Sequence, residues 1–300
     1  MLKIAYHSIY KHHLPEGHRF PMVKYDLLPR QLLHEGTCAK ANFFEPSIVD
    51  DVHLLRCHTK GYVERLKALT IERRDARKIG FPLSKELVQR ELIITDGTIK
   101  CCDYALQNGI AKNVAGVTHL AFSNKGEAFC MLNDQAVGAR YLQSKGLANK
   151  TLIVDLDVHQ GNGTAEIFKD DDNVFTFSMH GKANYPFQKE QSDLDIALET
   201  NTSDTEYLSI LKETLPKLIK THQPDFIFYL SGVDILASDK LGKLGCTLNG
   251  CKERDRYVLQ TCKDLNIPMQ CSMGGGYSPD IKIIIEAHAN TFRLAQEIYF

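Results

Sequence analysis

The feature that most limits what this chain can fold into is an alternation of strand-like and helix-like segments, which runs from about residue 86 to residue 300. Residues 225–233 form a continuous apolar run, which is typical of a strand covered on both faces. Residues 204–222 instead carry leucines at three- and four-residue spacing, which predicts an amphipathic helix with Asp204 as its N-cap. Strands that alternate with long helices favour a mainly parallel sheet with helices on both faces, so the sequence predicts an α/β fold.

The other predicted elements follow the same pattern. Helices are expected at 86–108, 134–145, 252–265 and 279–300, and strands at 151–159, 173–180 and 267–273, with a short apolar run at 114–120. The first 85 residues are less regular, so we expect loops and short helices that cover the sheet, with a strand at 2–7 inside it. The chain shows no repeat or linker, and residues 1–300 are therefore interpreted as a single domain.

Charge and hydropathy exclude several classes of protein. The chain has 36 basic and 37 acidic residues, a formal net charge of -1, so nothing draws the whole molecule to nucleic acid or anionic lipid. Its one basic cluster, residues 73–78, is interrupted by Asp75 and is interpreted as a solvated surface. No apolar run approaches the roughly 18 to 20 residues of a membrane span, and the N-terminus is typical of a strand rather than a signal peptide. We therefore expect a cytoplasmic protein with neither a membrane nor a nucleic acid as its direct partner.

Cysteine usage agrees with that compartment. Nine cysteines, an odd number, occur without a secretion signal, and no two form a Cys-x-x-Cys pair. We expect reduced thiols that pack as small apolar residues. Hydrophobic residues make up 43% of the chain, which is enough for a large core and excludes a disordered protein.

The segment richest in chemical groups is Thr151 to Gly163, which contains Asp155-Leu-Asp157-Val-His159. Alternate side chains of a strand share a face, so Asp155, Asp157 and His159 are expected to point the same way. Burying these groups unpaired would cost several kcal/mol each, and a divalent metal ion would neutralise them. The alternative is a hydrogen-bonded aspartate pair that fixes the following turn at 161–163.

A third metal ligand has to come from another strand end, because a catalytic zinc site takes three protein ligands and leaves one position for water. Asp234 follows the apolar run at 225–233 and is the preferred candidate, since sites in open α/β sheets gather at the carboxyl ends of strands. Asp239, five residues further into the same loop, is the alternative.

Two more strand ends carry weaker signals. Three glycines at 274–276 let the backbone approach a ligand closely, and the hydroxyl of Tyr277 could reach a substrate there, although such turns are also ordinary loops. His119 ends the apolar run at 114–120. A lone histidine in that position is usually a core residue, so its value depends on the other strand ends.

Together these segments resemble the histone deacetylase superfamily of zinc amidohydrolases, most closely its class IV and related bacterial members. The resemblance covers nearly the whole chain and rests on motifs in the same order. They are Leu14-Pro-Glu-Gly-His-Arg-Phe-Pro-Met22, Arg77-Lys-Ile-Gly-Phe-Pro82, Asp155-Leu-Asp-Val-His-Gln-Gly-Asn-Gly163, Ser178-Met-His-Gly181, Tyr185-Pro-Phe187, Asp234-Ile-Leu-Ala-Ser-Asp-Lys-Leu-Gly242 and Gly274-Gly-Gly-Tyr277.

The resemblance implies an arginase-like α/β fold with a zinc ion held by Asp157, His159 and Asp234, a ligand set that ferrous iron can also use. It implies that the hydroxyl of Tyr277 polarises the acyl carbonyl. The first histidine of the family motif falls on His119, which would pair with Asp155 as part of the catalytic machinery. The substrates implied are acylated lysine or a similar small amide.

The resemblance also implies two features around the zinc site. One is a narrow acyl tunnel past Phe129, with Leu120 and Gly275 on its wall. The other is a structural potassium ion near Asp155, His159 and Ser178.

The sequence departs from the family pattern at three positions. The family has Gly-Gly-x-His-His-Ala and then Gly-Phe-Cys, where this chain has Gly116-Val-Thr-His-Leu-Ala121 and then Ala128-Phe-Cys130. Leu120 therefore replaces the second histidine, the one thought to move a proton between zinc water and leaving amine, and leucine cannot transfer a proton. Val117 and Ala128 each add carbon atoms at the rim or wall of the acyl tunnel.

Two functions follow from these observations. The first is a zinc-dependent deacylase that is slowed by the loss of part of a general acid–base contribution, typically about 10²- to 10⁴-fold. The second is a catalytically silent relative that binds acylated ligands or a protein partner, which Leu120, Val117 and Ala128 together favour. An esterase or a polyamine deacetylase is a further alternative, because a fold does not set the substrate. No motif sets an oligomeric state.

Overall fold

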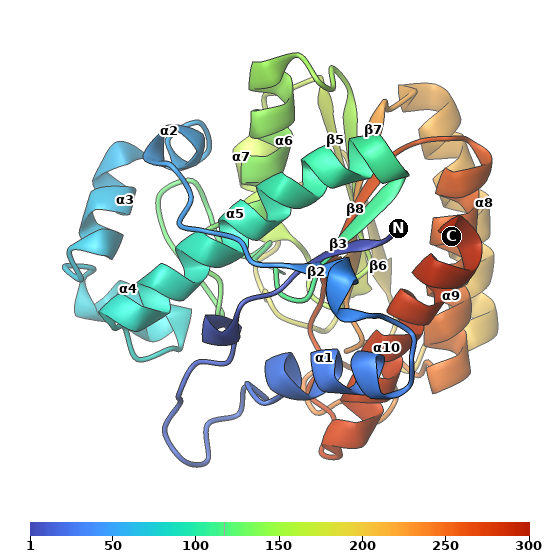
Figure 1. Cartoon of the computed structure of the whole chain (residues 1–300), viewed down its shortest axis with the longest axis horizontal. Coiled ribbons are helices and arrows are strands. Elements are labelled where there is room, and N and C mark those ends of the chain that lie inside the picture. Colours follow the sequence, from blue (N-terminus) through green and yellow to red (C-terminus); the bar gives the residue numbers. More distant parts are fainter. Residues whose placement is uncertain (117) are drawn as a thin grey trace.

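The computed structural model describes residues 1–116 and 118–300, and within them one sheet of eight strands runs through the molecule (Figure 1). The strands are β1 (Lys3–Ala5), β2 (Phe43–Phe44), β3 (Ile110–Asn113), β4 (Thr151–Asp155), β5 (Val174–Gly181), β6 (Leu194–Leu198), β7 (Phe226–Ser231) and β8 (Met269–Met273). Their order in the sheet is β2-β1-β3-β8-β7-β4-β5-β6, and every neighbouring pair is parallel. The expected α/β fold with a parallel sheet is therefore confirmed.

Helices cover both faces of the sheet. They are α1 (Lys24–His34), α2 (Asp51–Leu54), α3 (Lys60–Lys67), α4 (Arg73–Ile79), α5 (Lys85–Asn108), α6 (Asp134–Lys145), α7 (Asn162–Phe168), α8 (Asp204–His222), α9 (Leu248–Asp264) and α10 (Ile281–Tyr299). Helix α5 packs on α6 and against β1, β3 and β8, whereas α9 contacts both α8 and α10, and α1 packs on α10. Figure 1 shows α8, α9 and α10 together on one side of the strands and α5 with α6 on the other.

The central strands β4, β7 and β8 are buried at every residue. They lie between two helix layers, so side chains on both faces of each strand avoid water. This explains why the run at 225–233 is apolar without alternation, as the sequence predicts.

Two expectations about strand ends are wrong. The apolar run at 114–120 does not end a strand at His119, because β3 ends at Asn113 and the described residues 114–116 and 118–120 lie outside any strand. Strand β4 ends at Asp155, so Asp157 and His159 lie in the following loop rather than on the strand. The side chain of Asp155 accepts a hydrogen bond from the backbone N of Asp157 (3.1 Å), which turns the chain out of the sheet.

The predicted N-cap of the helix at 204–222 is also wrong. Ser203 is the N-cap of α8, and its side chain accepts a hydrogen bond from the backbone N of Glu206. Asp204 is the first helical residue, and its carboxylate accepts hydrogen bonds from the N and Oγ1 of Thr247 (2.8 and 2.6 Å). Both residue types favour N-caps, so the choice between adjacent candidates depends on this tertiary contact.

Three further expectations concern the cysteines, the basic cluster and membrane-spanning helices. The nine cysteines are all buried, and no disulfide links them in the described part of the chain. The basic residues of the 73–78 cluster lie exposed on α4, as a solvated surface requires. None of the described helices has both the length and the apolar character needed to cross a membrane.

Candidate metal centre

Four loops meet at the carboxyl edge of the sheet, because β3, β8, β7 and β4 are consecutive neighbours in it. The loop after β4 carries Asp157 and His159, and the loop after β7 carries Asp234. The loop after β8 carries the glycines at 274–276, and the loop after β3 carries His119. Parallel strands end at the same edge, so residues far apart in the sequence share one site.

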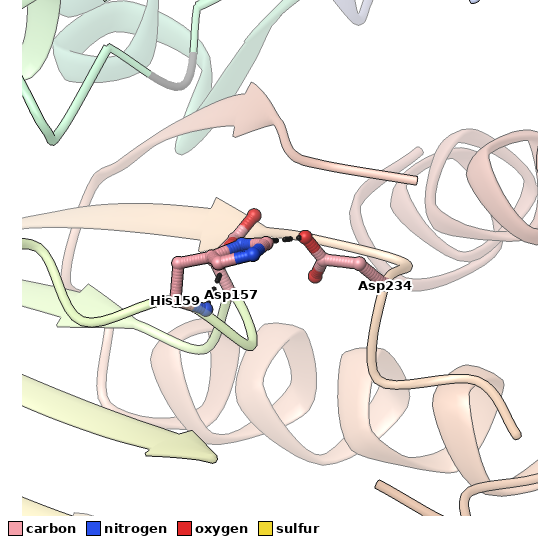
Figure 2. A group of neighbouring side chains, drawn as sticks. All are labelled: Asp157, His159 and Asp234. Carbon is pink, nitrogen blue, oxygen red and sulfur yellow. Dashed lines mark hydrogen bonds and ion pairs between the residues drawn. The ribbon is translucent and has the colours of Figure 1, made fainter. Parts of the chain in front are cut away.

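Asp157, His159 and Asp234 form a compact cluster at this edge (Figure 2). One possible ligand atom from each residue lies within 4.8 Å of the others. The Nδ1 of His159 lies 3.0 Å from Asp157 Oδ1 and 3.2 Å from Asp234 Oδ2. The two aspartates are 1% and 0% exposed, so their carboxylates are almost fully removed from water.

These residues fit a divalent metal ion. Asp234 Oδ2 is buried and makes no hydrogen bond of acceptable geometry within the described chain, even though His159 Nδ1 is close to it. A buried carboxylate oxygen without a donor is costly, and a cation would satisfy it. Carboxylate oxygen and imidazole nitrogen are ligand types that both zinc and ferrous iron take.

The charges of the cluster depend on one another. Burial disfavours a charged imidazole, but contacts with the carboxylates of Asp157 and Asp234 outweigh burial and raise the pKa of His159 to about 10. Burial and the charge of Asp157 raise the pKa of Asp234 to about 7. For Asp157, burial is outweighed by the hydrogen bond from His159, and its pKa is lowered. Two carboxylates in one buried space thus favour a positive charge between them.

Backbone contacts hold the two carboxylates in place. The N of Gly275 donates to Asp157 Oδ2 (2.8 Å), and the N of Val158 donates to Asp234 Oδ1 (3.0 Å). A Cβ atom added to Gly275 would lie 2.0 Å from Asp234 Oδ2 and 2.9 Å from Asp157 Oδ2. Only glycine fits this close approach, which is the use expected for the glycine-rich turn after β8.

His119 and Asp155 form a buried pair beside the cluster. The Nδ1 of His119 lies 2.6 Å from Asp155 Oδ2, and its Nε2 lies 3.9 Å from Asp157 Oδ1. Burial acts to lower the pKa of His119, but the charge and hydrogen bond of Asp155 raise it overall. The pair therefore fixes the imidazole with its second nitrogen toward the cluster.

Leu120 follows His119 and lines the same cavity. Its side chain is buried with Ala121 and Cys130, and Ala128 and Tyr185 pack against this group. The position where the resemblance expects a second histidine is thus surrounded mainly by carbon atoms.

Ala128 occupies a backbone conformation that suits glycine. Its φ is 43°, and that of Phe129 is 70°, both in the left-handed region that side chains with a Cβ adopt at a cost. This conformation gives a physical reason for the glycine that the resemblance expects at position 128. Val117, the other position at which the resemblance expects glycine, lies outside the described residues.

The cluster lies at the wall of a cavity of about 490 Å³. Phe20, Phe129 and Tyr277 narrow it, with the ring centroids of Phe129 and Tyr277 separated by 6.4 Å and those of Phe20 and Tyr277 by 6.0 Å. The ring of Tyr277 meets the ring of His159 edge to face at a centroid distance of 6.4 Å. Tyr277 is therefore next to the cluster and faces the same cavity.

Asp239, the alternative third ligand, does not join the cluster. Its Oδ2 accepts a hydrogen bond from the backbone N of Tyr277 (2.6 Å), and its Oδ1 accepts from the N atoms of Leu241 and Gly242 (both 2.8 Å). Asp239 thus holds the loop that carries Tyr277, and Asp234 is the better-placed ligand.

Asp155 and Ser178, which the resemblance places at a potassium ion, are direct neighbours in the sheet. They are paired in the register of β4 with β5, and both are buried. The Oγ of Ser178 lies 3.0 Å from His180 Nδ1. Strands β4 and β5 therefore bring Asp155 and Ser178 together, although the two residues belong to separate sequence motifs.

Lys24 lines the cavity, and the sequence analysis missed it. It is 1% exposed, and its Nζ donates to the backbone O of Gly274 (3.1 Å) and lies 6.0 Å from the ring centroid of Tyr277. Burial lowers its pKa to about 8. A signal was available, because Lys24 is four residues before the buried Leu28 and so lies on the apolar stripe of α1.

The comparison with known families agrees with this geometry. Residues 18–292 match the histone deacetylase domain. The chain belongs to the histone deacetylase family. In that family context, the buried Asp157, His159 and Asp234 are consistent with a site for a divalent metal ion.

The matches to individual relatives cover nearly all of the chain. An uncharacterized protein of Picosynechococcus sp. is 44% identical over 296 residues, which is 99% of each protein. Histone deacetylase 2 of Arabidopsis thaliana is 28% identical over 287 residues, which is 92% of this chain and 74% of that protein. The crystal structure of a histone deacetylase homologue from Aquifex aeolicus matches with a TM-score of 0.84 at 23% identity, covering 98% of this chain and 84% of the other. That last similarity concerns the fold alone.

Proposed function

We propose that this protein is a metal-dependent amidohydrolase that removes acyl groups from acyl-lysine or a similar amide. The observation that carries the proposal is the buried cluster of Asp157, His159 and Asp234 on the wall of a cavity that Tyr277 and His119 also line. Zinc is the proposed ion, and ferrous iron is the alternative.

The roles of the residues follow from their positions. A divalent ion in the cluster would lower the pKa of a water molecule and polarise the acyl carbonyl. Tyr277 donates a hydrogen bond to the oxyanion that develops on that carbonyl. His119 takes up a proton at Nε2, and Asp155 stabilises the charged imidazole through Nδ1. Phe129 and Leu120 form the apolar wall along the acylated side chain.

The proposed hydrolysis is slow, because Leu120 removes one of two imidazoles. General acid–base catalysis contributes about 10²- to 10⁴-fold, or roughly 3 to 5 kcal/mol of the barrier. His119 supplies part of it, and the contributions of the metal and Tyr277 are kept.

Release of a fluorophore from acetyl-lysine peptides at micromolar protein tests this function. We expect release that requires zinc, stops with a chelator, and is inhibited by a hydroxamate. Asp157→Ala is the matched control and should abolish it, because the carboxylate is in the cluster. Equal release by the wild type and by Asp157→Ala would contradict the proposal.

A catalytically silent binding protein is the second candidate. The burial of Leu120 with Ala121 and Cys130 favours it, since a leucine at this position cannot transfer a proton. It predicts that zinc-loaded protein binds acetyl-lysine peptides but leaves them intact at every protein concentration.

Two smaller proposals accompany the function. A structural potassium ion is proposed beside Asp155 and Ser178, supported by their pairing in the sheet. The family domain is proposed to span residues 1–300, because β1 pairs with β3 and α10 extends to Tyr299, both beyond the matched range.

A further inference from the structure

The rim of the cavity carries positive charge. Arg19, Lys78 and Lys243 line the cavity from three separate segments, and all three side chains are exposed. No exposed carboxylate accompanies them among the described residues that line the cavity. The acids there are Glu91 and Asp157, and each is only 1% exposed.

These three cations have few partners within the protein. Lys78 lies 3.8 Å from Asp75, and an exposed pair at that distance contributes little. Arg19 and Lys243 form no ion pair with any residue that the structure describes. The guanidinium of Arg19 lies 5.0 Å from the ring centroid of Phe129, so it is held against the tunnel wall. The rim therefore keeps cationic groups available to a ligand.

Charges deeper in the cavity do not reverse this sign. Glu91 is paired with the neighbouring Arg90, and Asp157 belongs to the metal cluster. Lys24 adds a buried cation whose hydrogen-bond partner is the carbonyl oxygen of Gly274. A ligand that approaches the cavity thus meets a positive field, although the formal net charge of the chain is -1.

We propose that Arg19, Lys78 and Lys243 select acylated amines that carry an anionic group at the end of the molecule remote from the acyl group. The proposal rests on the proposed function, which puts the acyl carbonyl at the metal cluster and the amine side of the substrate at the rim. A carboxylate there is attracted by the three cations, whereas an ammonium group is repelled. Acyl-lysine between acidic residues and small acylated amino acids share this chemistry. Acetylated polyamines and lysine-rich segments do not.

Binding measurements test the charge preference without relying on turnover. Three labelled acetyl-lysine peptides of equal length, flanked by aspartate, serine or lysine, are titrated into the zinc-loaded protein and followed by fluorescence anisotropy. We expect the aspartate peptide to bind roughly tenfold more tightly than the serine peptide at low salt, and the lysine peptide to bind most weakly. The preference should shrink at about 0.5 M salt, because screening shortens the range of the rim charges.

Competition experiments separate the two sources of the anionic group. N-acetyl-aminohexanoate and its neutral methyl amide represent the small acylated acids, and N-acetylputrescine represents the polyamines. If N-acetyl-aminohexanoate competes more strongly than its methyl amide, a small acylated acid is a sufficient ligand for the rim. Preference confined to the peptides identifies acidic residues around acyl-lysine as the ligand.

Charge-reversal variants locate the effect. Lys78→Glu and Lys243→Glu should remove or invert the preference for the aspartate peptide. Lys40→Glu is the matched control, because Lys40 is exposed and precedes β2, at the amino edge of the sheet opposite the cluster. The Lys40→Glu variant should keep the preference for the aspartate peptide.

Equal binding of the three peptides, or loss of the preference to the same degree in Lys40→Glu as in the rim variants, overturns the proposal. Charge-selective binding without hydrolysis supports the rim and contradicts the proposed hydrolysis. Hydrolysis without charge selectivity supports the proposed hydrolysis and contradicts the role proposed for the rim.

Discussion

His119 and Leu120 are neighbours in the same cavity but differ in what they can do with a proton. His119 is oriented by Asp155 and presents its second nitrogen toward the metal cluster. Leu120 offers only carbon atoms and is buried among Ala121 and Cys130. At the scale of single residues, the site keeps the cluster of Asp157, His159 and Asp234 and the imidazole of His119, whereas Leu120 cannot transfer a proton.

Leu120→His should therefore raise turnover. The new imidazole could recover up to about 10²- to 10⁴-fold, the usual contribution of general acid–base catalysis. The measurement is kcat on an acetyl-lysine peptide with zinc bound. Leu120→Asn is the matched control, because asparagine has a similar shape and does not titrate.

Crowding can mask this gain, since Ala128 packs against the group around Leu120. The substitution should be repeated with Ala128→Gly and with Val117→Gly. A gain in the asparagine control equal to that in the histidine variant would contradict the proton-transfer explanation.

Ala128→Gly should stabilise the fold or leave it unchanged. The left-handed φ of 43° costs a residue with a Cβ about 1 to 2 kcal/mol, while the greater flexibility of unfolded glycine costs about 0.5 to 1 kcal/mol. Urea unfolding measures the difference. Ala136→Gly, inside α6, is the control and should destabilise by about 1 kcal/mol. A comparable loss in both variants would show that Ala128 is not strained.

The clustering of Asp157, His159 and Asp234 could be predicted from the sequence, because these residues follow strongly apolar runs and strand ends share an edge. The choice between Asp234 and Asp239 could only be made in part, since both follow β7 and the backbone contacts of Asp239 depend on the folded loop. Lys24 was missed because lysine is rarely buried, even though its four-residue spacing from Leu28 places it on the apolar stripe of α1.

At the scale of elements, long helices and central strands were predicted well because tertiary packing agrees with their local pattern. The run at 114–120 misled because its residues are apolar for another reason. Val114 and Ala115 are fully buried in a loop after β3, so the run indicates burial rather than a strand. Strand β6 (Leu194–Leu198) was missed because it is an edge strand with partly exposed residues. Helix α7 was missed because it begins within the glycine-rich turn at 161–163.

Helix α1, which carries Lys24 into the cavity, is tied to α10 by charge. Arg293 on α10 binds the carboxylate of Glu35 at the end of α1 and that of Glu286 on its own helix. These hydrogen bonds lower the pKa of Glu35 and of Glu286. A carboxyl with a lowered pKa stabilises the fold above its unfolded pKa and loses that contribution as the pH falls through its folded value.

Arg293→Gln should lower the free energy of unfolding by about 1 kcal/mol at pH 7, because the charged groups are partly exposed and screened. The loss relative to wild type should shrink as the pH falls below about 4, the usual pKa range of a glutamate, and should disappear below the lowered folded pKa values of Glu35 and Glu286. Urea unfolding at pH 7 and below about pH 4 measures this loss of unfolding free energy. Lys217→Gln, in a fully surface pair with Glu213, should have a smaller effect. A loss that is independent of pH would contradict the charge assignment.

At the scale of the whole molecule, the parallel sheet makes the cluster of Asp157, His159 and Asp234 depend on folding. Asp157 and Asp234 lie in loops after β4 and β7, and only the folded sheet places them together. An ion that binds the folded state stabilises it by RT ln(1 + [L]/Kd), about 2.7 kcal/mol at a hundredfold excess over Kd.

Zinc should therefore raise the melting temperature of the metal-free protein by several degrees, as measured by calorimetry. Asp234→Asn should remove most of this shift, because it takes one ligand charge from the cluster. An equal shift in Asp234→Asn and wild type would place zinc elsewhere on the molecule.

The most direct test of the metal centre is the zinc content of the dialysed protein, determined by elemental analysis. We predict about one ion per chain in the wild type and in Asp239→Asn, whose side chain holds a loop rather than the cluster. We predict none in Asp157→Ala, provided that circular dichroism shows a folded chain. Full retention of zinc by folded Asp157→Ala would contradict the assignment of Asp157, His159 and Asp234 as the metal site.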